Sequence, residues 1–286
     1  MTGLEPIQVR RYGSRGRMVV VLHGGPGVSG SAAGLARCLA GDFQVLEPLQ
    51  RRSGAVPLSV IQHVKDLAAV TSKPAILIGW SWGAMLGLSF AAHYPEYVSD
   101  LVLIGCGTYD ESSRALLHQS LNRRLGKMER HRIKDLQVRL ASERDSTTRD
   151  AIFGEIGTAI MRAESYDLIA ETAASSDIIS PDSAGHVETW EDVLRLQREG
   201  VEPNIFSAIK ARVLMLHGDV DPHPGPETRD LLRRFIPQLE YVGLDRCGHE
   251  PWRERYAYDR FLEILRQWIL RRSLSSLGQG RGPDTG

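Results

Sequence analysis

A serine between two glycines is the side chain of this sequence best placed to act as a nucleophile. Residues 79–83 read Gly-Trp-Ser-Trp-Gly and lie between the apolar runs 75–78 and 84–93. The first run predicts a buried strand and the second a helix. A sharp turn between them leaves room only for small flanking residues and exposes the hydroxyl of Ser81 near the amino end of a helix. A glycine-rich turn with an incidental serine is the alternative.

A serine hydroxyl becomes a strong nucleophile only when a base takes its proton and an acid holds that base. The predicted strand 212–216 runs into a loop with Asp219 and Asp221, and the predicted strand 239–242 runs into a loop with His249. Because open parallel sheets build their sites beyond the carboxyl ends of their strands, these side chains are predicted to meet there. We predict His249 as the base, with the acid among the two aspartates. A turn aspartate and a surface-loop histidine are the alternatives.

Short apolar runs without alternation recur in two parts of the chain, each followed by a helix-like pattern. This rhythm indicates α/β architecture, with a mostly parallel, doubly wound sheet that is covered on both faces. The predicted strands are 17–22, 43–46, 75–78, 101–104, 212–216 and 239–242, and the predicted helices are 31–39, 58–70, 84–93, 227–235 and about 255–270.

A long region between these two parts breaks the rhythm. Residues 109–206 are rich in Arg, Glu, Leu and Ala and contain no strong β run. We predict that they form a helical cap inserted into a core of residues 1–108 and 207–272, lying over the strand ends. Residues 273–286 contain Ser, Gly and Pro and are predicted to be a disordered tail, because they cannot bury enough apolar surface.

The composition narrows the class of partner. The 286 residues are 42% hydrophobic and 24% charged, as in ordinary globular domains, and 35 Lys and Arg balance 35 Asp and Glu. We therefore expect neither nucleic acid nor a membrane as a partner. The three cysteines form no CxxC pair and the first residues form no apolar leader, so we expect a reducing, cytoplasmic location. No His and Asp grouping has metal-ligand spacing, and we expect neither a metal nor another cofactor.

Four motifs in this order resemble the α/β-hydrolase fold superfamily, and within it the branch typified by proline iminopeptidases. They are His-Gly-Gly-Pro-Gly at 23–27, the serine motif at 79–83, Gly-Asp-Val-Asp at 218–221 and Gly-His at 248–249. The resemblance covers about residues 7–107 and 207–271. It implies that Asp221 is the acid, since the family acid follows Gly-x-x. It also implies that the backbone N–H groups of Gly25 and Trp82 hold the oxyanion of the intermediate.

The chain departs from the proline iminopeptidase pattern at two places. Residues 49–54 read Leu-Gln-Arg-Arg-Ser-Gly where that branch has Asp-Gln-Arg-Gly-x-Gly, and Trp80 stands where a glycine usually precedes the serine. An aminopeptidase of this branch also needs a cap carboxylate for the free α-ammonium group of its substrate. The candidates are Glu191, Asp192 and the pair Tyr166-Asp167.

Together these features predict a hydrolase that cleaves small carboxylic esters, amides or short peptides through an acyl-enzyme on Ser81. An aminopeptidase that releases N-terminal proline is one alternative, and a ligand receptor with little turnover is another. A phosphate-binding role for residues 23–27 is disfavoured because they lack the Lys and Ser/Thr of a P-loop. The residues predicted to line the substrate pocket are His23, Gly24, Trp80, Glu191 and Trp252.

Overall fold

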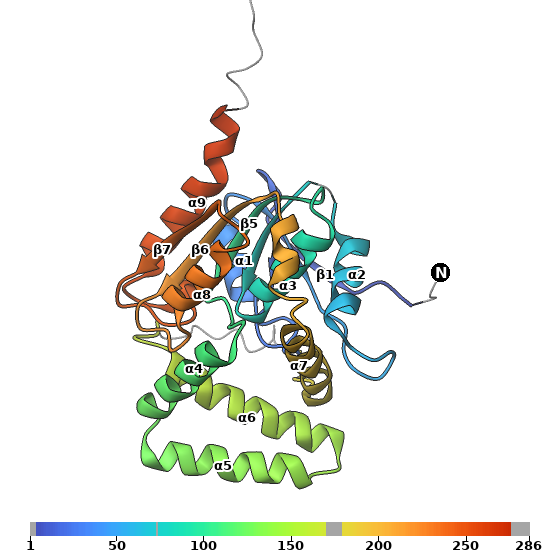
Figure 1. Cartoon of the computed structure of the whole chain (residues 1–286), viewed down its shortest axis with the longest axis vertical. Helices are drawn as coiled ribbons and strands as arrows, with labels where there is room; N and C mark the ends of the chain where they lie inside the picture. The colour runs from blue at the N-terminus through green and yellow to red at the C-terminus, as the bar shows by residue number, and fades with distance from the viewer. Residues whose placement is uncertain (1–3, 73, 170–178, 276–286) are drawn as a thin grey trace, which may run out of the picture.

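A twisted seven-stranded sheet forms the centre of the computed structural model, which describes residues 4–72, 74–169 and 179–275 (Figure 1). The strands are β1 (Val9–Tyr12), β2 (Met18–Leu22), β3 (Gln44–Pro48), β4 (Ala75–Trp80), β5 (Val98–Ile104), β6 (Arg212–Gly218) and β7 (Leu239–Leu244). Their order is β1-β3-β2-β4-β5-β6-β7, and every neighbouring pair is parallel except β1 with β3. The prediction of a mostly parallel sheet is confirmed.

Strand β1 was not among the predicted strands. Its four residues, Val-Arg-Arg-Tyr, carry no buried side chain and pair with β3 at the edge of the sheet. An antiparallel edge strand needs neither a continuous apolar run nor a following helix, so the pattern that identifies the inner strands does not apply to it.

The inner strands bury side chains on both faces, which is why their sequences are apolar throughout. Along β4, Leu77 packs on one face, against the layer that holds α2 (Val60–Val70), α3 (Trp82–His93) and α8 (Gly225–Arg233). Its neighbours Ile76 and Ile78 pack on the other, against α1 (Ala33–Leu39) and α9 (Tyr258–Ser275). Successive strand residues point to opposite faces, so one apolar run supplies both layers. The doubly wound arrangement is thereby confirmed.

The described residues between β5 and β6 form four α-helices at one end of the sheet, in the segment predicted to be the cap (Figure 1). They are α4 (Glu111–Arg124), α5 (Lys127–Ser142), α6 (Ser146–Glu164) and α7 (Ser183–Arg198). Asp110, Asp145 and Asp182 cap the first, third and fourth of these, each accepting a hydrogen bond from the backbone N–H three residues later. Helices α5 and α6 pack through a small core of their own that includes Ile133, Leu136 and Ile152.

These helices lie within the residues predicted to form the cap, although the exact limits 1–108, 109–206 and 207–272 stay a prediction. The predicted disordered tail begins at residue 273, but α9 continues to Ser275. The end of that helix was placed too early because the apolar periodicity stops before the backbone hydrogen bonds do. Residues 276–286 lie outside the described residues. No described helix has the length and apolar character that a membrane span would need.

A buried acid at the junction of cap and core makes the fold sensitive to pH. Glu202 is 2% exposed and accepts a hydrogen bond from Ser89 Oγ on α3, at 2.5 Å. Burial raises the pKa of Glu202 from 4.5 to about 7, although the bond from Ser89 opposes the shift. A carboxyl whose pKa is raised by folding binds its proton more tightly in the folded state. Its stabilising effect is complete below pH 4.5 and is lost as the pH rises through about 7.

We expect Glu202→Gln to be more stable than the wild type at pH 8, by about 3 kcal/mol, and to differ little from it at pH 4. The amide is neutral at every pH and its oxygen still accepts a hydrogen bond from Ser89. Urea unfolding of both proteins at the two pH values measures the difference. An identical dependence on pH in the two proteins would contradict the raised pKa.

Candidate active site

Ser81 occupies a strained position at the turn between β4 and α3. Its backbone has φ 55° and ψ −119°, a conformation that residues other than glycine rarely adopt. The flanking glycines are sterically required. A Cβ on Gly79 would lie 2.2 Å from the carbonyl oxygen of Gly83, and a Cβ on Gly83 would lie 2.3 Å from that of Leu22. The turn thus has the geometry expected of a nucleophile elbow, with Ser81 partly exposed at its tip.

The loops after β6 and β7 bring Asp221 and His249 into contact. Asp221 Oδ2 lies 2.7 Å from His249 Nδ1, and the Asp221 side chain is fully buried. Asp219, the alternative acid, instead accepts a hydrogen bond from the backbone N–H of Cys247 at 3.2 Å, which links the two loops. Of the two aspartates, only Asp221 has the position of an orienting acid.

The histidine loop is attached to the serine elbow by Trp80. The indole Nε1 of Trp80 donates to the carbonyl oxygen of His249 at 3.1 Å, and the two rings lie 5.7 Å apart. Gly105, at the end of β5, lies so close that a Cβ there would be 2.7 Å from His249 Nδ1. Among the described residues, no hydrogen bond joins Ser81 Oγ to the imidazole. Bonds of this kind often tighten only when substrate is bound.

The charges around His249 favour its protonated form. Burial lowers the pKa of this imidazole, but the carboxylates of Asp221 and Glu164 and the hydrogen bond to Asp221 outweigh it and raise the pKa to about 9. Burial also works against the charge of Asp221, yet the positive charge of His249 and the hydrogen bond from His223 hold the pKa of that carboxyl well below its usual range. The carboxylate of Asp221 and the protonated form of His249 therefore stabilise each other.

The glycine loop after β2 lies beside the elbow, where Gly24 packs against the Trp80 ring. Gly25 has φ 50°, a left-handed conformation that glycine adopts without strain. In the described part of the chain, the N–H groups of Gly25 and Trp82 donate to no protein acceptor, as an oxyanion hole requires. Gly24 has a different reason to be glycine, because a Cβ there would lie 2.7 Å from the Trp80 ring. His23 is buried beneath the loop and donates from Nδ1 to the Gly24 carbonyl oxygen at 2.9 Å.

The cap holds the glycine loop from the other side. The backbone N–H of Asp182 donates to the Gly27 carbonyl oxygen at 2.8 Å, and His186 Nδ1 donates to that of Pro26 at 3.1 Å. The Asp182 carboxylate also accepts from Ser53, both from its backbone N–H at 2.6 Å and from its hydroxyl at 2.7 Å. The amino end of α7 therefore positions this loop. Nothing in the spacing of these residues along the chain indicates the contact.

The other residues predicted for the pocket lie in different surroundings. Trp252 is buried and packs edge-on against Trp80 at 5.1 Å, so it supports the elbow from the core side. Glu191 is exposed on α7. Its neighbour Asp192 accepts the backbone N–H of Val60 at 2.9 Å and so caps α2. Trp252 and Asp192 therefore stabilise the surrounding structure, whereas Glu191 is exposed to solvent.

The third predicted amine binder is a pair beside the histidine loop. The backbone N–H groups of Tyr166 and Asp167 donate to the buried carboxylate of Glu254 at 2.8 and 2.7 Å. The Asp167 carboxylate pairs with Arg255 at 3.2 Å, and Tyr166 is 46% exposed. The cap carboxylate beside His249 is instead Glu164. Sequence reasoning did not single it out, because it stands in an ordinary helical pattern.

Glu164, His223 and His249 satisfy the distances of a three-residue metal set, with one ligand atom of each within 4.8 Å of the others. The two imidazole rings, however, stack at 4.3 Å with an angle of 13°. Nitrogen lone pairs lie in the ring planes, so stacked rings direct them along nearly parallel lines rather than toward one ion about 2 Å away. A metal would require one ring to turn. The expectation that no metal is used stays a prediction.

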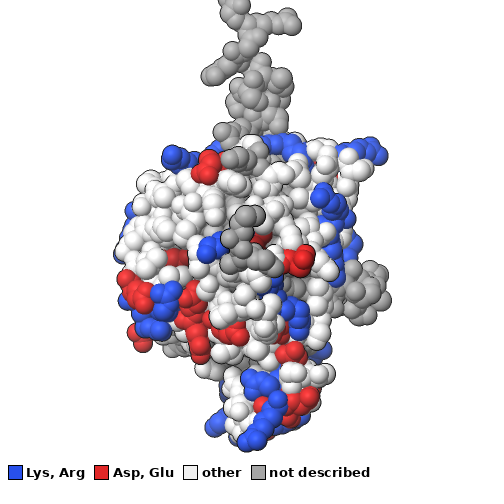
Figure 2. Space-filling view, turned by 90° about the vertical axis from the view of Figure 1, so that its right-hand side faces the viewer, with Lys and Arg blue, Asp and Glu red and all other residues white. Residues whose placement is uncertain are grey.

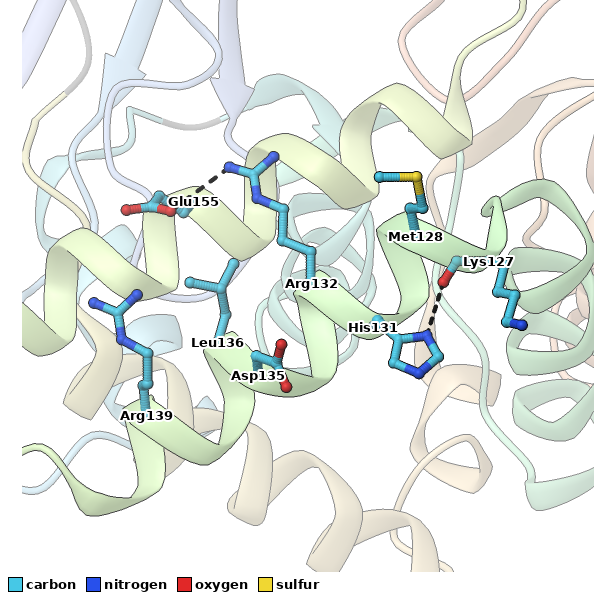
Figure 3. Close-up of a pocket in the computed structure, with 8 residues that line it drawn as sticks. All are labelled: Lys127, Met128, His131, Arg132, Asp135, Leu136, Arg139 and Glu155. Atoms are coloured by element: carbon cyan, nitrogen blue, oxygen red, sulfur yellow. Dashed lines mark hydrogen bonds and ion pairs between the residues drawn. The ribbon is translucent and has the colours of Figure 1, made fainter.

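A surface hollow lies elsewhere, on the α5–α6 hairpin of the cap (Figure 3). It encloses about 640 Å³ and none of the predicted site residues lines it. Arg132 of α5 pairs with Glu155 of α6 across it, at 3.7 Å. Figure 2 shows basic and acidic side chains intermixed over one face, including this hairpin at the lower end of the view. Charges of both signs are therefore mixed on the face in that view, in keeping with the equal numbers of basic and acidic residues in the sequence.

Comparison with known proteins places the chain in one family. The sequence profile of the alpha/beta hydrolase fold matches residues 60–256. Serine hydrolase BPHL from Homo sapiens is 24% identical over 160 residues, which are 54% of this chain and only 42% of that protein. A thermophilic esterase from Thermogutta terrifontis has a TM-score of 0.58 at 19% identity, with 92% of each chain covered.

Two further solved structures share the fold. A meta-cleavage product hydrolase from Pseudomonas fluorescens IP01 has a TM-score of 0.57 at 17% identity, covering 92% of this chain and 94% of that one. An E-2-(acetamidomethylene)succinate hydrolase has a TM-score of 0.59 at 20% identity, with coverages of 92% and 94%. At such identities the likeness shows the fold alone, and the substrate must be argued from the site.

Proposed function

Because this chain belongs to the alpha/beta hydrolase fold family, we propose that it is a serine hydrolase of small carboxylic esters or amides. In this proposal Ser81 is the nucleophile, His249 the base and Asp221 the acid that orients the base. The contact of 2.7 Å between Asp221 Oδ2 and His249 Nδ1, beside a serine held at φ 55°, carries the proposal. Serine hydrolase and esterase relatives support the same class.

The proposed reaction has two halves. Nε2 of His249 takes the proton of Ser81 Oγ, which attacks the substrate carbonyl carbon. The N–H groups of Gly25 and Trp82 then donate to the resulting oxyanion, and Asp221 stabilises the imidazolium. Return of the proton to the leaving alcohol or amine produces the acyl-enzyme. The same histidine then activates a water molecule, whose attack releases the carboxylic acid and restores Ser81.

An aminopeptidase of the proline iminopeptidase type is the second candidate, and the position of Glu164 is the observation that favours it. This cap carboxylate is 13% exposed and lies 4.0 Å from His223 Nδ1, which stacks on His249. A carboxylate so close to the base is suited to receive a substrate α-ammonium group. The departures at Trp80 and at residues 49–54 speak for the more general hydrolase. A cytoplasmic location and a small-molecule substrate are part of the same proposal.

We expect the rate of hydrolysis to rise with pH from neutrality to about pH 9. Only the neutral imidazole can accept the serine proton, and a base with a pKa of about 9 is neutral in about 1% of molecules at pH 7. The acid limb of the pH dependence of kcat/KM reports a pKa of the free enzyme. That pKa should therefore be well above 6.5, the ordinary pKa of histidine. A limb near 6.5 would contradict the electrostatic account of His249. The profile is measured with one soluble ester between pH 5 and 10.

Covalent labelling tests the proposed function directly. A fluorophosphonate probe should label the protein once per chain, and peptide mapping should place the label on Ser81. A panel of acyl p-nitrophenyl esters and proline β-naphthylamide then separates the candidates. Turnover of esters supports the general hydrolase, and turnover of the proline amide alone supports the aminopeptidase. A chain that is not labelled and turns over neither class would instead fit a ligand-binding protein.

A further inference from the structure

The carboxylate of Asp221 is shared by two imidazoles. Its Oδ2 accepts from His249 Nδ1 at 2.7 Å, while its Oδ1 accepts from both the backbone N–H and the Nδ1 of His223, each at 2.9 Å. Three donors on one buried carboxylate leave it a single orientation. The orientation of the carboxylate fixes the orientation of the His249 imidazole. The contacts of His223 therefore help to orient both Asp221 and His249.

His223 also contacts the base itself. Its ring stacks on that of His249 with centroids 4.3 Å apart and an angle of 13°. The backbone of His223 is held in turn, because His217 Nε2 donates to its carbonyl oxygen at 2.9 Å. The ring of His223 is therefore fixed at one edge by Asp221 and across one face by His249, and it closes one side of the catalytic imidazole.

The third contact comes from the cap. Glu164, the last residue of α6, accepts the backbone N–H of His249 on its carbonyl oxygen at 3.0 Å. Its side chain reaches to 4.0 Å from His223 Nδ1. A Cβ on Gly248 would lie 2.3 Å from the same carbonyl oxygen, so the glycine before His249 is needed for this close approach. The cap thus contacts the base through a backbone hydrogen bond and brings a negative charge beside it.

We propose that His223 and Glu164 are positioning residues for His249, with His223 fixing the triad carboxylate and the ring plane and Glu164 stabilising the imidazolium from the cap. This inference rests on the proposed function. His223 is not a proton carrier in this proposal, since its Nδ1–H remains bonded to Asp221. When His249 takes the serine proton, the charge it gains is faced by the carboxylates of Asp221 and Glu164.

Other charged groups around His249 have their own partners. Glu250 follows it in the chain and pairs with Arg253. His217 lies 3.5 Å from Asp221 Oδ2 on the far side of the carboxylate, and burial lowers its pKa, so it adds no positive charge at neutral pH. Glu164 is therefore the charge that can be removed near His249 without breaking the triad.

Substitutions of His223 and of Glu164 are expected to shift the acid limb of the pH–rate profile in opposite directions. His223→Phe keeps a flat ring for stacking but removes one donor from Asp221, which strengthens the negative charge on the carboxylate and moves the limb to higher pH. Glu164→Gln keeps the size and shape of the side chain but removes its negative charge. This change moves the acid limb to lower pH, by roughly one pH unit. Both should slow the reaction at its optimum about tenfold, His223→Phe because the ring of His249 is less well oriented and Glu164→Gln because the imidazolium loses a facing negative charge. Glu155→Gln, on the same helix but at the outer hollow, is the matched control and should move neither quantity.

The measurement uses the second-order rate constant of fluorophosphonate inactivation between pH 5 and 10, so that no substrate need be known. Near-ultraviolet circular dichroism verifies the fold of each variant. His223→Gln, which keeps a side-chain donor, replaces the phenylalanine variant if the latter does not fold; its limb should stay near that of the wild type while its rate falls. Unchanged limbs and rates in folded H223F and E164Q would overturn the proposal. A wild-type protein that is not labelled at Ser81 would instead overturn the proposed function.

Discussion

Ser81→Ala is expected to reduce ester hydrolysis by a factor on the order of 10⁵–10⁶ and to abolish fluorophosphonate labelling. The loss is large because no other group can form the acyl-enzyme, and the oxyanion donors accelerate only a residual attack by water. The fold should be retained, because alanine is no larger than serine and the strain of a φ of 55° is present in both proteins. Initial rates with a p-nitrophenyl ester, at the pH optimum of the wild type, measure the effect.

Ser142→Ala is a suitable control for this experiment. Ser142 is an exposed serine at the carboxyl end of α5, whose hydroxyl donates to Val138 and Arg139 of the same helix. Its loss should leave the rate unchanged. Labelling that persists in Ser81→Ala would assign the nucleophile to another residue. A second variant, Ser81→Gly, should be at least as stable as the wild type, because glycine adopts positive φ without strain.

Asp221→Asn is expected to lower kcat by a factor of about 10⁴ while leaving the fold intact. The amide can no longer accept from both His249 and His223 as a carboxylate does, and it carries no charge to stabilise the imidazolium. The same change should lower the pKa of His249, because the largest attraction for its proton is removed. The acid limb and the rate of the same ester reaction report both effects.

The matched variant is Asp219→Asn, two residues earlier in the same loop. Asp219 uses one oxygen to accept the backbone N–H of Cys247, and an asparagine oxygen can make the same bond. We therefore expect less than a threefold change in rate, because the variant retains this hydrogen bond. A larger loss in Asp219→Asn than in Asp221→Asn would move the acid to Asp219.

Most of the fold follows from local patterns. The strands β2 to β7 are visible as apolar runs because a strand buried on both faces has no polar side to interrupt it. The turn around Ser81 is visible because its two glycines are dictated by atoms within a few residues or on the neighbouring strand. The sequence profile confirms the alpha/beta hydrolase fold family, while hydrolase activity and the roles of Ser81, Asp221 and His249 stay proposals that the geometry supports.

What the sequence alone could determine was therefore the sheet, the serine elbow and the order of the loops, since each depends on residues that are close in the chain. Only the tertiary structure decided which groups surround the base. The ring of His223 stacks on that of His249, 26 positions later in the chain, and Glu164 comes from a cap helix 85 positions before His249. The cap acids Glu191 and Asp192, singled out from local resemblance, lie in solvent and at the start of α2. A helical pattern determines which face is polar, but only the packing of the cap on the core determines which polar group meets the site.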